Sequence, residues 1–75
     1  MPLQVKLDCK KLKKLREQNN LTQEKLAELS NISDRHLRNL EAASVNPSAT
    51  VLCRLSLVLE VSMDELMIVT GDETE

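Results

Sequence analysis

Five places along the chain share one pattern of polar and apolar positions. A short polar residue stands at each place, with an apolar residue before it and another four positions after it. This arrangement is typical of a helix start, because the polar side chain caps a free backbone N–H while the two apolar side chains pack together. The predicted caps are Asp8, Thr22, Ser33, Ser48 and Ser62. The pattern therefore predicts five helices.

The spacing of the remaining residues indicates how far these helices extend. The first is expected to run to about Gln18, and the second from about Gln23 to Leu29. In the fourth, apolar residues recur with a helical period at Val51, Leu52, Leu55, Val58 and Leu59. In the fifth, Glu65 stands three positions after Ser62, which predicts a capping box.

The two ends of the chain follow a different pattern. Leu3, Val5 and Leu7 alternate with polar residues, which is the period of a strand. The stretch Met67–Thr70 either extends the fifth helix or forms a short partner strand, and the sequence leaves both alternatives open. Residues 71–75 are expected to form a frayed acidic tail.

Composition favours an all-α fold and one domain. The 75 residues include fourteen Leu and no aromatic residue, and Leu, Lys and Glu favour helices over strands. A chain of this length is expected to form a single domain over residues 1–75, with its core at about 8–70. The sequence contains no apolar run long enough for a membrane span and no secretory signal, so a cytoplasmic location is expected.

Several kinds of chemistry are excluded by what the sequence lacks. Cys9 and Cys53 lie far apart without metal-ligand spacing, so we expect two buried, reduced thiols and no metal or cofactor. Paired carboxylates, nucleophile–base arrangements and phosphate-binding glycine loops are also missing, which argues against an enzyme. Without aromatic residues the chain has no platform for stacking single-stranded bases.

The net charge of −2 conceals a strong asymmetry. Residues 1–38 carry nine Lys or Arg against five Asp or Glu, whereas residues 39–75 carry one Arg against seven acidic residues. A chain divided in this way can present a basic face to phosphates despite its acidic total. The alternative is a charged surface that is only solvated, and the lysines at positions 10, 11, 13 and 14 allow both interpretations.

Residues 22–41 carry the most informative pattern. Two short predicted helices are joined by Ser30, Asn31 and Ile32 alone, so they must cross at a steep angle. Ala27 supplies the small side chain that such a crossing needs, and Asn tolerates the left-handed backbone of a sharp turn better than most residues. This is the pattern of a helix-turn-helix, whose second helix can enter the major groove of DNA.

The same stretch resembles the lambda-repressor-like, or XRE-type, family. The matching positions are Arg16, Leu21–Ala27, Asn31–Ser33, Leu37, Leu40–Glu41, Pro47 and Leu59–Ser62. The resemblance covers about residues 10–68 and implies a five-helix fold. It further implies a transcriptional regulator that reads a two-fold symmetric operator in double-stranded DNA as a homodimer. A repressor is expected, and the sequence leaves an activator open as the alternative.

The resemblance also implies which residues meet DNA. Thr22 and Gln23 match positions beside a phosphate, and the third helix turns a polar face to the groove through Asp34, Arg35, Arg38 and Asn39. Arg35 is the best candidate base reader, because a guanidinium binds O6 and N7 of guanine together, and Asn39 suits adenine. For Arg38 a base and a phosphate are both left open as contacts. His36 is expected to contact the DNA backbone.

Two acidic residues in this region have other expected roles. Asp34 either accepts from cytosine or only complements the helix dipole. Glu41 is expected to form a structural ion pair with Arg16, which would tie the first helix to the end of the third.

The segment after Glu41 departs from the family pattern. Where the family commonly has Asn-Gly and basic residues, this chain has Ala42-Ala43-Ser44-Val45-Asn46. Ser44 and Asn46 remain candidate phosphate contacts but carry no charge, which predicts a shallow salt dependence of binding. The departure favours the alternative function, a protein-interaction module of the same fold, such as an antitoxin-like partner, with weak or no DNA binding.

A dimer interface is expected from apolar residues that the core does not use. The candidates are Leu57, Met63, Met67, Ile68 and Val69. The sequence does not divide them between core and interface, and it points to no small-molecule ligand.

Overall fold

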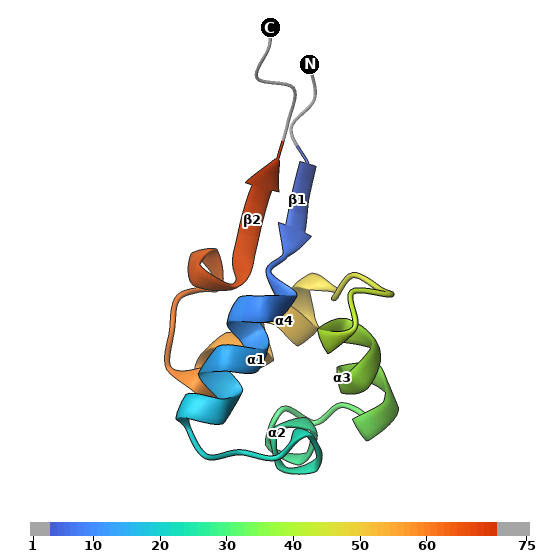
Figure 1. The fold of residues 1–75 in the computed structure, drawn as a ribbon, viewed down its shortest axis with the longest axis vertical. Coiled ribbons are helices and arrows are strands. Elements are labelled where there is room, and N and C mark those ends of the chain that lie inside the picture. The colour runs from blue at the N-terminus through green and yellow to red at the C-terminus, as the bar shows by residue number, and fades with distance from the viewer. Residues whose placement is uncertain (1–3, 71–75) are drawn as a thin grey trace, which may run out of the picture.

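The computed structural model describes residues 4–70, and the predicted tail at residues 71–75 lies outside them. The elements are β1 (Gln4–Leu7), α1 (Cys9–Gln18), α2 (Gln23–Leu29), α3 (Asp34–Glu41), α4 (Ala49–Leu59), the 3-10 turn η1 (Met63–Leu66) and β2 (Met67–Thr70). Figure 1 shows the helices gathered in one body, from which β1 and β2 extend side by side. The predicted helical fold class is confirmed.

Four of the predicted caps start helices in the structure. Asp8, Thr22, Ser33 and Ser48 each accept from the backbone N–H three residues on, at 3.1, 3.0, 2.9 and 3.2 Å. Each bond satisfies one of the N–H groups that a helix start leaves free. The first four helix starts were therefore readable from local sequence.

The same helices end in one way, without glycine. A residue one or two positions past the last helical residue has a left-handed backbone, with φ between 58 and 62°, at Asn20, Asn31, Ala43 and Glu60. The next residue then donates its N–H to the carbonyl five positions back, at 3.0–3.1 Å in all four cases. This is the Schellman arrangement, which stops a helix within one residue. Because each helix is stopped in this way, the chain forms short helices separated by sharp turns.

The fifth predicted helix is replaced by a tighter and shorter element. Ser62 makes no side-chain capping bond, and the chain forms only the four-residue turn η1 before entering β2. Leu66 is fully buried at the end of this turn, and its carbonyl accepts from the Asp8 N–H at 2.8 Å. A longer helix would remove the next residues from their pairing with β1. Long-range pairing thus prevails over the local capping signal.

The two ends of the described chain pair as antiparallel strands. Val5 lies opposite Val69, and Leu7 lies opposite Met67. Of the two alternatives left open for residues 67–70, the structure shows the strand. Leu7 is buried at the base of this ribbon, whereas Val5 and Val69 are 55% and 60% exposed. The ribbon is therefore anchored at one end only.

Leucine side chains form the core. The buried apolar residues are Leu7, Leu12, Leu26, Ala27, Leu37, Leu40, Leu52, Leu55, Leu59 and Leu66. The expected burial of both thiols is wrong: Cys9 is half-buried, Cys53 is exposed, and both are free. Cys53 falls on the outer side of α4, next to the core-facing Leu52. None of the helices within residues 4–70 is long and apolar enough to cross a membrane.

Candidate nucleic-acid interface

The helices α2 and α3 form the predicted helix-turn-helix. Ala27 is only 2% exposed, and its carbonyl accepts from the Ile32 N–H at 3.0 Å, which closes the turn. Asn31 has φ 58°, the left-handed conformation expected at this position. A larger side chain at Ala27 would push the two helices apart, because no space remains between them.

The polar and apolar sides of α3 are sharply divided. Leu37 and Leu40 are fully buried, whereas Arg35 and Arg38 are exposed. His36 and Asn39 are half-buried. Within residues 4–70, Arg35 makes no hydrogen bond or salt bridge, so all its donors are free for a ligand. This division leaves one face of a core-anchored helix open to the groove of a nucleic acid.

Asp34 forms an ion pair one turn along the same helix. Its Oδ2 lies 2.7 Å from Nη2 of Arg38, with the two side chains 33% and 60% exposed. Oδ1 of Asp34 is buried and has no partner within the described residues. The carboxylate thus turns toward Arg38, and neither oxygen is free to accept from a cytosine without a change of this arrangement.

Arg16 and Glu41 meet as a nearly buried ion pair. Nε of Arg16 donates to Glu41 at 2.7 Å and Nη2 donates at 3.2 Å, with the side chains 11% and 4% exposed. Arg16 also donates to the Leu21 carbonyl at 2.8 Å. Removing one partner of a buried pair costs about 3–5 kcal/mol, because the other charge is left uncompensated. The pair thus joins α1, the turn before α2 and the end of α3.

Gln23 belongs to the same network, which the sequence did not indicate. Its Nε2 donates to Oε1 of Glu41 at 2.9 Å. An amide nitrogen carries two hydrogens, so one is bound by Glu41 while the other stays available. Glu41 therefore orients the side chain that the family resemblance places beside a phosphate. Thr22, next to it, is exposed, and its hydroxyl caps α2.

The connection between α3 and α4 has little side-chain chemistry of its own. Ser44 donates its hydroxyl to the Asn39 carbonyl at 3.1 Å, and Asn46 is exposed. Ala43 has φ 62°, a conformation that a Cβ disfavours and glycine adopts readily. The two predicted phosphate contacts thus lie together on this loop, but neither brings a charge.

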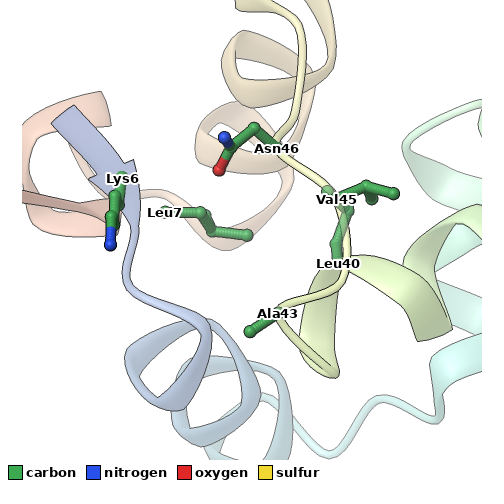
Figure 2. A pocket seen from close by; sticks show the side chains of 6 residues that line it. All are labelled: Lys6, Leu7, Leu40, Ala43, Val45 and Asn46. Carbon is green, nitrogen blue, oxygen red and sulfur yellow. The ribbon is translucent and has the colours of Figure 1, made fainter. Parts of the chain in front are cut away.

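A cavity of about 310 Å³ separates this loop from β1. Figure 2 shows Leu7 pointing from β1 toward Leu40, Val45 and Asn46 on the opposite side, with Lys6 at the edge of the strand. Lys6 lines the same cavity, is exposed, and forms no salt bridge within residues 4–70. It places a cation at the rim of this cavity, across from the loop that lacks one, with its ammonium directed away from the loop residues in Figure 2. Sequence reasoning missed Lys6, because only the tertiary fold places β1 here.

The predicted dimer residues fall into two groups. Leu57, Ile68 and Val69 are 71%, 41% and 60% exposed. Met63 and Met67 are partly buried against the core and have less apolar surface to offer. Val5, which the sequence prediction omitted, adds exposed apolar surface to the ribbon. The ribbon thus groups three exposed apolar side chains within the described chain, whereas Leu57 on α4, Leu29 on α2 and Val45 on the α3–α4 loop are exposed singly.

Comparison with known proteins agrees with this geometry. The family model for helix-turn-helix domains, HTH_3, matches residues 12–66, well over half of the chain. None of the curated proteins matches.

Solved structures similar to this one include regulators from several bacteria. The controller protein C.AhdI of a restriction-modification system from Aeromonas hydrophila is 29% identical, with TM-score 0.74, over 77% of this chain and 88% of its own. The N-terminal DNA-binding domain of SinR from Bacillus subtilis is 26% identical, with TM-score 0.74, over 89% of this chain and 94% of its own.

The clp gene regulator ClgR from Corynebacterium glutamicum is 26% identical, with TM-score 0.73, over 77% of this chain. This chain spans only 62% of the ClgR chain. The family match covers the helix-turn-helix, the buried Arg16–Glu41 pair and the core around them. The chain belongs to the HTH_3 family of helix-turn-helix domains, the XRE-type DNA-binding regulators of transcription.

Proposed function

We propose that this protein is a repressor that reads a two-fold symmetric operator in double-stranded DNA as a homodimer. One observation carries the proposal. Arg35 projects with a free guanidinium from α3, a helix held in place by two fully buried leucines and by the Arg16–Glu41 pair. A guanidinium that is unpaired within residues 4–70 and stands on a firmly packed helix is suited to bidentate recognition of guanine.

The other residues of the face divide into base and phosphate contacts. Asn39 and Arg38 lie on α3 with Arg35 and are proposed to reach base edges, whereas His36 is proposed to meet the DNA backbone. Phosphate contacts are assigned to Thr22, Gln23, Ser44 and Asn46, with Lys6 as the added cation. Phosphate contacts position a protein on the duplex, and base contacts supply the specificity.

A second copy of the chain is proposed to pack on the exposed apolar residues Leu57, Ile68 and Val69. One helix-turn-helix reads a half-site that is short, so two copies are needed for useful specificity. Such a regulator acts in the cytoplasm, where the operator is.

Selection from a random duplex library at two salt concentrations tests the proposal. We expect enrichment of a two-fold symmetric motif with half-sites about one helical turn, or roughly 34 Å, apart. Arg35→Ala should relax one or two base positions in each half-site, because a bidentate contact discriminates by about 1–3 kcal/mol. Arg54→Ala, an exposed arginine on α4, is the matched control and should leave the motif unchanged.

The second candidate function is a protein-interaction module with weak or no DNA binding, such as an antitoxin-like partner. It is favoured by the uncharged α3–α4 loop and by Asp34, which neutralises one of the two exposed arginines of α3. If no duplex is enriched even at low salt while the protein stays folded, direct DNA reading is contradicted. Arg35 would then be sought in a contact with another protein.

A further inference from the structure

The ion pair on the outer face of α3 links two of the charged side chains that this helix would turn toward DNA, those of Asp34 and Arg38. Asp34 holds Nη2 of Arg38 at 2.7 Å through Oδ2. An i, i+4 pair with this exposure contributes little to the stability of the helix. The remaining carboxylate oxygen is buried without a partner, which is an unfavourable position if stability were the only function of Asp34.

Asp34 leaves most of the binding capacity of Arg38 unused. A guanidinium has five N–H donors in a rigid plane, and within the described residues Arg38 spends one of them on Asp34. The others can still make the paired contact with guanine O6 and N7. To reach a phosphate at the edge of the groove, Arg38 would have to leave the carboxylate, which also repels that phosphate.

We propose that Asp34 is a specificity-determining positioning residue, which orients Arg38 toward a base edge and withholds it from the DNA backbone. The inference rests on the proposed function, because it assumes that α3 meets duplex DNA. Arg35 has no such partner within residues 4–70, so nothing there withholds it from a phosphate, whereas Asp34 holds Arg38 to the base edge. The expected signature is therefore a change in selectivity and salt dependence rather than in folding.

The test compares wild-type protein with Asp34→Asn, which removes the charge and keeps the shape. Two duplexes of equal length serve as probes, the operator recovered from the library and a random sequence. We expect the variant to bind the random duplex about 3–10-fold more tightly, with a salt slope steeper by about 0.9, the value of one added phosphate contact. Affinity for the operator should change less, so the specificity ratio falls.

Two further measurements separate positioning from a general effect of charge. Asp64→Asn removes the charge of an exposed carboxylate on η1, away from α3. It should leave the salt slope of DNA binding and the ratio of operator to random-duplex affinity unchanged. The base position relaxed by Asp34→Asn should be the one relaxed by Arg38→Ala. Adding Asp34→Asn to Arg38→Ala should then have no further effect on the slope.

Circular dichroism and a melting curve show whether each variant is folded, and Asp34→Ser, which keeps a polar group at the helix start, replaces the amide if it is not. An Asp34→Asn protein with unchanged slope and base preference overturns the inference and leaves the proposed function intact. Wild-type protein that binds neither duplex contradicts both.

Discussion

The helix-turn-helix and the β-ribbon are built on opposite principles. In α2 and α3 each helix has its own cap and its own Schellman end, and the only large apolar side chain that is well exposed there is Leu29 at 49%. The eight-residue ribbon has no such local devices, and it exposes Val5, Ile68 and Val69. Two strands of this length are marginal alone. The structure of the helix-turn-helix is therefore specified by residues close in sequence, whereas the ribbon depends on contacts between residues far apart in the chain.

The largest expected effect comes from breaking the network that supports the first region. Glu41→Ala leaves Arg16 charged, nearly buried and unpaired, so the free energy of unfolding should fall by about 3–5 kcal/mol, as measured by urea denaturation. Glu65→Ala is the control, because Glu65 meets Lys11 only at 4.0 Å on the exposed surface and should cost less than about 1 kcal/mol. If Glu41→Ala and Glu65→Ala lowered the free energy of unfolding equally, burial would not explain the stability that the Arg16–Glu41 pair provides.

Placing a charged side chain on the exposed face of the ribbon should weaken the proposed dimer without unfolding the protein. In Val69→Lys we expect the dimer dissociation constant to rise at least about tenfold, because a buried valine contributes about 1.5 kcal/mol or more. Sedimentation across a concentration series measures it. Leu29→Lys places the same charge on an exposed apolar site of α2 and should leave association unchanged. If Val69→Lys also has no effect, Leu57 becomes the remaining interface candidate.

Ala43 tests whether the local turns store strain. Its φ of 62° favours glycine, so Ala43→Gly should stabilise the protein by about 1 kcal/mol, seen as a higher melting temperature. Ala42→Gly, one residue earlier with φ −85°, should instead lose about 0.4–1 kcal/mol through the added freedom of the unfolded chain. A loss from both substitutions would contradict a strained turn at Ala43.

The smallest effect concerns the point where the two regions meet. Removing the cation beside the α3–α4 loop, in Lys6→Ala, should weaken DNA binding a few-fold and reduce the salt slope by about 0.9. Lys10→Ala removes an exposed lysine from α1 and serves as the control for net charge. If Lys6→Ala and Lys10→Ala reduced the salt slope of DNA binding equally, Lys6 would act only through the net charge of the protein and not through a phosphate contact.

Elements whose signals are short-range could be predicted from the order of residues alone. Asp8, Thr22, Ser33 and Ser48 cap helices as predicted, because a cap interacts with a backbone group only three residues away. The helix-turn-helix followed in the same way from Ala27 and from the left-handed backbone at Asn31. The placement of Asn46 and Ser44 on one loop also needed no knowledge of the fold.

Features that depend on residues far apart in the chain became visible in the folded molecule. Ser62 carries a complete local capping signal, yet pairing of the following residues with β1 shortens the helix to a turn. The bond from Gln23 to Glu41 and the approach of Lys6 to the α3–α4 loop were likewise invisible in any local spacing. Burial of Leu7 and Leu66 together in one core favours the pairing of β1 with β2 over a longer helix, because the energy of burial exceeds that of a single cap.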